Sequence, residues 1–232
     1  VKANAAYVPP FGSGATLYIR PYLMGTNAVI GVKPATEYMF RILVTPVGPY
    51  FKGGMKPIKV IIDRVQDRAA PRGTGDIKAG GNYASSIFSG EKAHQMGYSN
   101  VMYLDAAEHK YIEECGAANF FGIKDGTYVT PKSPSILPSI TNKSLRQLAQ
   151  DMGLKVEERP IAVDELKSFS EAGACGTAAV ISPIGSIFDL DTNEFISYGD
   201  EVGPVSLELY NCLRDIQYGR AEDVHGWITI IE

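Results

Sequence analysis

Residues 119–129 read NFFGIKDGTYV and limit the class of fold that this chain can adopt. Two apolar runs flank Asp125-Gly126, a pair that favours the two-residue turn of a β-hairpin. Hairpin strands are antiparallel, whereas a fold built only of βαβ units has parallel strands joined by helices. The segment therefore predicts a sheet with at least one antiparallel pair.

Helices and further strands are predicted on both sides of this hairpin. The additional strands are predicted over 15–20, 38–44, 59–62, 101–104, 155–158 and 178–181. Helices are predicted over 83–96, 142–152 and 164–170 and from Pro204 onward, the last with Val205, Leu209, Leu213 and Ile216 on one face. Pro21 is expected to end the first strand. Because strands and helices do not alternate strictly, we expect a mixed α/β (α+β) fold.

The composition is that of a folded globular protein. Of 232 residues, 45% are hydrophobic and 21% are charged, which excludes a disordered, collagen-like or coiled-coil chain. The net charge is -4 and no basic run lies among aromatic residues, so we expect no nucleic-acid partner. No segment approaches the roughly 20 apolar residues that cross a membrane, so we expect no membrane partner.

The N-terminus and the cysteines bear on the context of the chain. The N-terminal VKANAAYVPP has neither an initiator Met nor the apolar core of a signal peptide, so we expect a piece of a longer protein. Cys115, Cys175 and Cys212 are odd in number and widely spaced, which favours a reducing cytosol over a disulfide scaffold. The three histidines are equally scattered and predict no metal site, and the missing GxSxG motif argues against a serine hydrolase.

A glycine-rich segment holds the first candidate for chemistry. Residues 73–83 read GTGDIKAGGNY, with Lys78 among glycines and Tyr83 at the start of a predicted helix. The spacing fits neither a Walker A loop nor GxGxxG, so the segment gives weak support to a nucleotide site. Flanking glycines let the backbone approach a flat ligand, and a lysine held there could form an imine. The alternative is a solvated loop lysine.

Three more segments could bind a ligand, and each has a structural alternative. One carboxylate of Glu113-Glu114 could point inward, or both could be solvated turn acids. In LPSIT, residues 137–141, the N–H groups of Ile140 and Thr141 could bind an anion, or the segment is an ordinary helix cap. Residues 173–179, GACGTAA, could admit a ligand to the backbone or form a tight loop packed for steric reasons.

One cofactor would use all four segments. Pyridoxal phosphate requires an imine-forming lysine, an acid facing its pyridine nitrogen, a phenol at its ring hydroxyl, and N–H and hydroxyl donors around its phosphate. Those groups could come from Lys78, Glu114, Tyr83, Thr141 and Thr177.

At these residues the chain resembles the branched-chain amino acid aminotransferases of pyridoxal-phosphate fold type IV. The matching segments run in family order: LYIRP (17–21), KAGGNY (78–83), Glu114 with NF (119–120), LPSIT (137–141), GTA (176–178), and IQYG (216–219) with Gly226-Trp227. The resemblance implies a large domain built as a pseudo-barrel of strands with surrounding helices, plus the C-terminal part of a smaller α/β domain. Residues 1–47 would be the remainder of that small domain, 48–57 the interdomain loop, and 58–232 the large domain.

The resemblance also implies a role for each site residue. Lys78 would form a covalent imine with pyridoxal 5′-phosphate and move a proton between substrate and cofactor, while Glu114 would face the pyridine nitrogen and Tyr83 the ring hydroxyl. The phosphate would be bound by Ile140, Thr141 and Thr177, with Arg68 as a more distant helper. The substrate would contact Tyr18, Arg20, Thr177 and Ala178, with Arg20 facing the second carboxylate of glutamate or 2-oxoglutarate.

The implied activity is a ping-pong transamination between leucine, isoleucine or valine and 2-oxoglutarate, by a cytoplasmic homodimer. Three questions stay open at this point. The same fold serves D-amino acid aminotransferases and aminodeoxychorismate lyases, although the Tyr-Ile-Arg-Pro and Gly-Gly-Asn-Tyr segments argue against both. The chain could also fold without turning over substrate, because the family has a further N-terminal segment. The order of preference among the three amino acids is not predicted.

Overall fold

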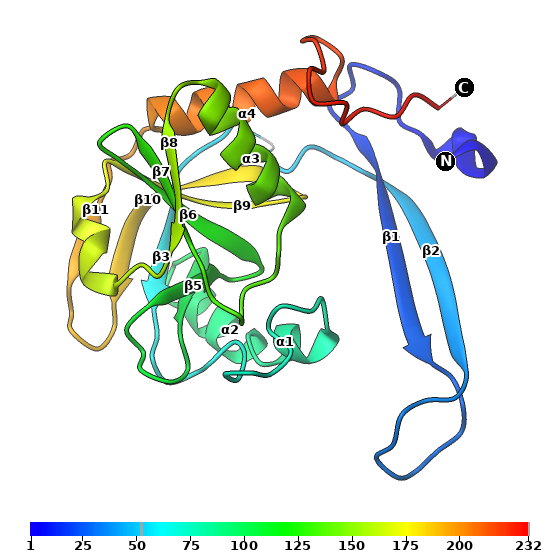
Figure 1. Cartoon of the computed structure of the whole chain (residues 1–232), viewed down its shortest axis with the longest axis horizontal. Helices are drawn as coiled ribbons and strands as arrows, with labels where there is room; N and C mark the ends of the chain where they lie inside the picture. The colour runs from blue at the N-terminus through cyan, green and yellow to red at the C-terminus, as the bar shows by residue number, and fades with distance from the viewer. Residues whose placement is uncertain (52, 232) are drawn as a thin grey trace. The chain divides into compact units, whose positions relative to one another are not determined.

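The computed structural model describes residues 1–51 and 53–231 and divides into two compact units, each described here by itself (Figure 1). The first unit comprises Val1–Lys52 with Thr229–Glu232, and the second comprises Gly53–Ile228. The predicted interdomain loop, 48–57, includes Lys52, and the predicted large domain ends at Glu232; these two residues lie outside the described part. The predicted boundaries at 47 and 57 stay predictions.

The first unit is a two-stranded antiparallel ribbon preceded by a short helical segment. Its elements are the 3-10 helix η1 (Lys2–Tyr7) and the strands β1 (Thr16–Gly25) and β2 (Tyr38–Val47). The expectation that Pro21 ends the first strand is wrong, because β1 continues through it in register with Ile42. Among the described residues β1 pairs with β2 alone, and an edge strand tolerates a residue that has no N–H to donate.

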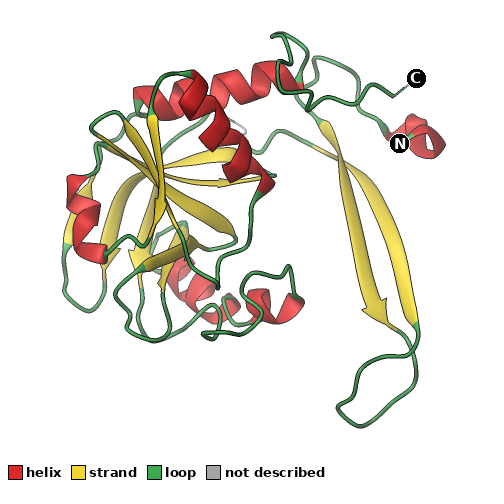
Figure 2. Cartoon of the chain, viewed as in Figure 1, coloured by secondary structure: helices red, strands yellow, loops and turns green. Residues whose placement is uncertain are grey.

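The second unit is built around one sheet that closes on itself. Its strands are β3 (Ile58–Ile62), β4 (Asn100–Leu104), β5 (Ile112–Cys115), β6 (Ala118–Lys124), β7 (Thr127–Pro131), β8 (Lys155–Arg159), β9 (Glu171–Gly176), β10 (Val180–Asp189) and β11 (Phe195–Ser197). Pairing runs β10-β3-β4-β5-β6, and β9 joins β6 back to β10, so these six strands form a closed barrel (Figure 2). The predicted mixed α/β fold with a strand pseudo-barrel is confirmed.

The hairpin predicted from residues 119–129 is confirmed. Strands β6 and β7 are antiparallel, with Lys124 opposite Thr127. The two turn residues have positive φ, 48° at Asp125 and 69° at Gly126, which is the backbone of the tight hairpin turn that an Asp-Gly pair favours. Near the start of β6, Asn119 pairs with Glu114 of β5 on one edge and Cys175 of β9 on the other, so it is part of the barrel wall.

The helices are α1 (Gly80–Ala84), α2 (Ile87–Gln95), α3 (Ile140–Asp151) and α4 (Pro204–Gln217), with a 3-10 helix η2 (Val163–Ser168). The prediction of a single helix over 83–96 is wrong, since α1 and α2 are separated at Ser85 and Ser86. The Ser85 hydroxyl donates to the carbonyls of Arg68 and Asn82, and the Ser86 hydroxyl donates to that of Tyr83. Serine hydroxyls that bond nearby carbonyls compete with the helical pattern.

Helices α3 and α4 pack on the barrel through an apolar cluster. Phe121 and Tyr128 stack with ring centroids 4.9 Å apart, and the helices contribute buried aliphatic side chains to the same cluster. These include Leu145 and Leu148 of α3 and, of the predicted face of α4, Leu209, Leu213 and Ile216, while Val205 is only partly buried against the cluster. Each large apolar side chain buried in this way contributes roughly 1.5–3 kcal/mol. This packing fixes α3, whose N-terminus belongs to the candidate site.

Residues 173–179 differ from the expectation. The segment is not a loop throughout, because residues up to Gly176 belong to β9, and the strand predicted over 178–181 begins only at Val180. Strand β9 is hydrogen-bonded on both edges, with Ala174 opposite Phe120 and Gly173 opposite Phe121 of β6. A Cβ at Gly173 would overlap the ring of Phe121, so the close packing of β9 on β6 requires glycine there.

No helix in the described ranges is long and apolar enough to cross a membrane.

Candidate active site

Lys78 and Tyr83 form a pair at the start of α1. The Lys78 amine donates a hydrogen bond of 2.8 Å to the Tyr83 hydroxyl, and Nζ lies 5.1 Å from the centre of the phenol ring. Lys78 is exposed and Tyr83 is half-buried. The structure therefore brings together the residue expected to form the imine and the residue expected to face the ring hydroxyl of the cofactor.

A buried asparagine shapes the loop that carries Lys78. The Asn82 side chain is 7% exposed; its amide donates to the carbonyls of Thr74 and Ile77, and its Oδ1 accepts from the Thr74 hydroxyl. These bonds tie Asn82, which follows Lys78, to Thr74 and Ile77, which precede it, and so hold the loop around Lys78 closed. No role was predicted for Asn82, because an asparagine before a tyrosine in a glycine-rich loop is by itself an ordinary turn residue.

Both acids of the Glu113-Glu114 pair are buried, so the alternative of two solvated turn acids is excluded. Each is 3% exposed, on strand β5. Successive strand residues point to opposite faces, and Glu113 accepts from the Ser133 hydroxyl at 2.6 Å. Glu114 accepts at Oε1 from the Leu137 N–H at 2.7 Å and from the Asn119 amide at 3.3 Å.

The second oxygen of Glu114 is less occupied than the first. Oε2 accepts no hydrogen bond from the described residues and lies 3.6 Å from Nε of Arg68. Burial raises the pKa of Glu114, while the charges of Arg68 and Lys78 and the Leu137 N–H act in the opposite direction. The charge of Lys78 therefore acts on Glu114, although no hydrogen bond joins them.

Arg68 lies beside Glu114 and holds two loops. Its Nη2 donates to the carbonyls of Gly75 and Ser135, and its Nε is buried without a hydrogen-bond partner in the described structure. A Cβ at Gly75 would overlap the backbone of Ser135, so only glycine permits the two loops to approach this closely. The phosphate role predicted for Arg68 stays a prediction, and its observed contacts favour a role at Glu114.

The N-terminus of α3 presents two free backbone donors. Ser139 caps the helix, and its hydroxyl accepts from the Asn142 N–H at 3.2 Å. The N–H groups of Ile140 and Thr141, in the first turn, have no partner among residues 1–51 and 53–231. Unpaired first-turn donors, with the positive end of the helix dipole, favour an anion. The predicted cap and the predicted anion site are therefore compatible.

The turn between β9 and β10 follows a residue of β9 that is connected to Glu114 through neighbouring strands of the sheet. Glu114 is opposite Asn119, and Asn119 is opposite Cys175, two residues before Thr177. Thr177 and Ala178 are exposed on this turn. The turn ends at Val180, which has a φ of 64° while the Ile181 N–H donates to the Ala179 carbonyl at 2.8 Å. Such backbone strain in a branched residue is often found at functional sites.

Tyr18 and Arg20 lie on β1 of the first unit. The Arg20 guanidinium donates to the Tyr18 hydroxyl at 2.9 Å and lies 5.2 Å from the centre of its ring. The two residues predicted to contact substrate are thus adjacent on one face of the ribbon, two positions apart, as strand geometry requires.

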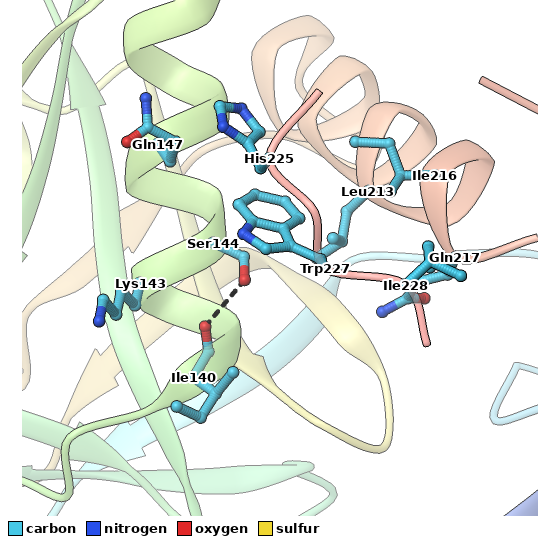
Figure 3. Close-up of a pocket in the computed structure, with 10 residues that line it drawn as sticks. All are labelled: Ile140, Lys143, Ser144, Gln147, Leu213, Ile216, Gln217, His225, Trp227 and Ile228. Atoms are coloured by element: carbon cyan, nitrogen blue, oxygen red, sulfur yellow. Dashed lines mark hydrogen bonds between the residues drawn. The ribbon is translucent and has the colours of Figure 1, made fainter. Parts of the chain in front are cut away.

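The described residues contain no group of three or more His, Cys, Asp or Glu side chains that could hold a metal ion. A cavity of about 540 Å³ lies between α3, the end of α4 and residues 225–228 (Figure 3). His225 stacks on Trp227 and bonds Asp151 at 2.6 Å. Of the predicted site residues only Ile140 lines this cavity, so it is distinct from the region of Lys78 and Glu114.

Comparison with known proteins gives a consistent result. The amino-transferase class IV family matches residues 2–187. The chain is 49% identical to the branched-chain-amino-acid aminotransferase of Haemophilus influenzae, over 100% of this chain and 69% of that protein. It is 50% identical to the enzyme of the same name from Helicobacter pylori, over 98% of this chain and 67% of that protein.

Solved structures agree with these relatives. The branched-chain amino acid aminotransferase of Escherichia coli matches with a TM-score of 0.80 and 30% identity, over 94% of this chain and 71% of that one. The enzyme from Thermobaculum terrenum, solved in its PLP-form, has a TM-score of 0.75, with 28% identity over 92% of this chain and 68% of that one. By the extent of the family match and by these identities, the chain belongs to the class IV aminotransferases, with their type IV fold.

Proposed function

We propose that this chain transfers the amino group of leucine, isoleucine or valine to 2-oxoglutarate, with pyridoxal 5′-phosphate as the cofactor. The observation that carries the proposal is the buried carboxylate of Glu114, held at Oε1 by two N–H donors while Oε2 accepts none from the described residues. A buried carboxylate is costly unless a partner uses it. The names of the two relatives support the substrate, and the PLP-form of the Thermobaculum terrenum enzyme supports the cofactor.

The donor and acceptor groups of this site fit pyridoxal phosphate. Oε2 of Glu114 is available to a protonated ring nitrogen, the Lys78 amine lies at a phenol, and the N–H groups of Ile140 and Thr141 are available to a phosphate. Pyridoxal phosphate, when bound, would supply an electron sink that stabilises negative charge on the substrate carbon.

Lys78 and Tyr83 would act at the reacting carbon. Lys78 would hold the cofactor by a covalent bond from Nζ. Once the substrate amine has displaced it, the free Lys78 amine would take the proton from the substrate carbon and deliver it to the cofactor. The Tyr83 hydroxyl, 2.8 Å from Nζ, would orient the amine and contact the ring hydroxyl of the cofactor. A positioned amine of this kind is a general base as well as a nucleophile.

Glu114 would keep the proton on the ring nitrogen. Burial raises the pKa of its carboxyl, and the positive charges of Arg68 and Lys78 favour the ionised form that this role needs. Arg68 would thus serve the cofactor by holding Glu114 ionised in a buried place, besides joining the loops at Gly75 and Ser135.

The phosphate would bind at the N-terminus of α3. Two backbone donors, from Ile140 and Thr141, and the Thr141 hydroxyl would surround it, with the Thr177 hydroxyl from the β9–β10 turn. Each interaction of an anion with a helix N-terminus contributes about 0.3–1 kcal/mol when exposed and more when partly buried.

The substrate would be recognised at both ends. Backbone N–H groups of Thr177 and Ala178 would bind its α-carboxylate. Arg20, bonded to Tyr18, would bind the second carboxylate of glutamate or 2-oxoglutarate. A single arginine beside otherwise apolar substrate contacts would let the site accept both a branched apolar side chain and an acidic one. The amino donor and the 2-oxo acid that accepts the amine would then react in turn, in a ping-pong order, in a cytoplasmic homodimer.

The test uses the purified chain with added pyridoxal phosphate. Reduction with borohydride should fix the cofactor to the peptide that contains Lys78, and leucine with 2-oxoglutarate should yield glutamate. Lys78→Ala should lose both results, whereas Lys167→Ala, at an exposed lysine paired with Glu194, should keep both. Cofactor bound at another lysine, or turnover of D-alanine or aminodeoxychorismate in place of leucine, would contradict the proposal.

A further inference from the structure

A hydrogen-bond network of buried polar side chains joins Glu114 to the N-terminus of α3. Asn142, 8% exposed in the first turn of α3, donates from Nδ2 to Oδ1 of Asn119 at 3.2 Å and to Oγ1 of Thr130 at 2.9 Å. Its Oδ1 accepts from the Tyr128 hydroxyl at 2.9 Å. Asn119, 4% exposed, then donates from Nδ2 to Glu114 and to the Leu137 carbonyl.

One backbone carbonyl fixes which groups donate and which accept in this hydrogen-bond network. The Thr130 hydroxyl donates its only proton to the Phe120 carbonyl at 2.8 Å, so its oxygen can only accept from Asn142. The Asn142 NH₂ group must therefore face Thr130, and its second proton faces Oδ1 of Asn119. Both protons of the Asn142 NH₂ group are therefore donated, and its Oδ1 accepts one hydrogen bond.

The orientation of Asn119 follows from that of Asn142. With Oδ1 bonded to Asn142, the NH₂ group of Asn119 is turned toward Glu114 Oε1 and the Leu137 carbonyl. The opposite orientation would place a carbonyl oxygen against the carboxylate, where like partial charges repel. Leu137 also donates its own N–H to Glu114, so the acid and the loop leading into α3 are held by one amide.

We propose that Asn142 is a positioning residue that orients the Asn119 amide toward Glu114 and so couples the predicted phosphate site to the predicted ring-nitrogen acid. The inference rests on the proposed function for the role of those two sites. The Asn142 side chain bonds Asn119, Thr130 and Tyr128 and not Glu114 itself. The Asn142 N–H donates to the Ser139 hydroxyl that caps the helix. A phosphate bound at Ile140 and Thr141 would therefore stabilise the same helix turn that fixes the acid.

The test compares variants at Asn142 and at Asn119, the two asparagines of this hydrogen-bond network. Asn142→Ala, or the nearly isosteric Asn142→Leu if the alanine variant does not fold, removes the orienting donor. Asn119→Ala removes the amide itself, and the double variant tests whether one acts through the other. Tyr128→Phe is the matched control, since it removes a hydrogen bond to Asn142 on the accepting side and leaves both donated bonds in place.

The primary measurement needs no cofactor. The titration of the Glu114 carboxyl is followed by NMR in the free protein, with Glu114→Gln for assignment. None of these variants replaces Arg68, Glu113 or Lys78, the charged residues that act on Glu114. We expect the midpoint to move upward in Asn142→Ala and Asn119→Ala, to move no further in the double variant, and to stay in place in Tyr128→Phe. The dissociation constant for pyridoxal phosphate should rise about tenfold in the two single alanine variants, the equivalent of one net hydrogen bond.

An unchanged Glu114 titration in a folded Asn142 variant would overturn the inference and leave Asn142 with a purely structural role. Additive shifts in the double variant would do the same, because Asn142 would then act independently of Asn119. If the wild-type chain does not bind pyridoxal phosphate at all, the proposed function fails, while the titration of the free protein still decides whether Asn142 orients Asn119.

Discussion

Nε of Arg68 lies 3.6 Å from Oε2 of Glu114, and the two residues are only 6% and 3% exposed. Neither charge can be solvated well at this depth, so each is the main compensation for the other. The pair also joins the loop of Lys78 to the loop that leads into α3, because Arg68 bonds the carbonyls of Gly75 and Ser135. Removing either charge should therefore affect stability as well as the site.

Arg68→Met should lower the free energy of unfolding by about 3–5 kcal/mol at neutral pH, because it leaves the Glu114 carboxylate buried without a counter-charge. The loss should be smaller in mildly acidic solution, where Glu114 binds a proton. Urea unfolding at the two pH values measures both. Arg220→Met, which breaks an exposed pair with Asp215, should cost no more than about 1 kcal/mol. Equal losses in the two variants would refute the role of burial.

Stability should fall as pH rises above the ordinary glutamate value of 4.5, partly because of Glu113. Burial raises the pKa of Glu113 in the folded protein, despite the bond from Ser133. The folded state therefore keeps a proton that the unfolded chain has already lost, and its contribution is lost as pH passes the raised value. Relative to Glu113→Gln, the wild type should lose unfolding free energy between about pH 4.5 and neutrality. A difference that does not change with pH would contradict the raised pKa.

Tyr83→Phe should slow transamination by about tenfold, because the Lys78 amine loses the hydroxyl that orients it at 2.8 Å. The covalent attachment of the cofactor should persist, since Lys78 itself is unchanged. Steady-state rates and borohydride-trapped cofactor are measured on the same preparation. A variant that loses attachment and rate together would show that Tyr83 maintains the loop and not only the amine.

Thr141→Val should weaken pyridoxal phosphate binding about ten- to hundredfold, by removing one hydroxyl bond to a charged phosphate. Binding of pyridoxal, which lacks the phosphate, should not change. Ser139→Ala is the matched control, because it removes the helix cap and should cost about 1 kcal/mol of stability. If Thr141→Val weakened both ligands equally, the phosphate would have to bind elsewhere.

Gly75→Ala should destabilise the protein by about 1–3 kcal/mol, because its Cβ overlaps the Ser135 backbone and forces the two loops apart. Gly90, inside α2, has open space around its Cα, so Gly90→Ala should instead stabilise by roughly 0.5–1 kcal/mol. Thermal unfolding of both variants checks the opposite signs. A Gly75→Ala protein as stable as the wild type would mean that the loops can separate freely.

The elements that sequence could predict are those whose signals are local. The Asp125-Gly126 turn needs only its own two residues, and the inner face of α4 follows from a helical period that ends at Ile216. A local rule of the same kind misplaces the end of the first strand at Pro21, because a proline is tolerated where β1 is an edge strand, and that depends on the pairing with β2 outside the segment itself. The break after Tyr83 likewise depends on hydroxyl bonds of Ser85 and Ser86, one of them to Arg68.

The polar side chains that support the site could not be found in this way. Asn82 and Asn119 lie in segments that carry the family resemblance and Asn142 lies just after one, but the residue type indicates no role, because asparagines are common in turns and caps. Their importance depends on burial, which places Asn142 against Thr130 and Asn119 through the pairing of separate strands and the packing of α3. The reacting residues, by contrast, lie in short segments of unusual composition, such as the glycines around Lys78.

The closed barrel also has a consequence for how the protein comes to be folded. Strand β3 pairs in parallel with β10, and Arg64 beside β3 bonds Asp189 at the end of β10, 125 positions later. Pairings between such distant segments form slowly, because a long loop must be ordered before any contact rewards it. Every large-domain residue proposed to hold the cofactor lies inside that loop. A nascent chain that still lacks β10 thus has the reacting lysine but no closed barrel, and we expect cofactor loading to follow the synthesis and pairing of β10.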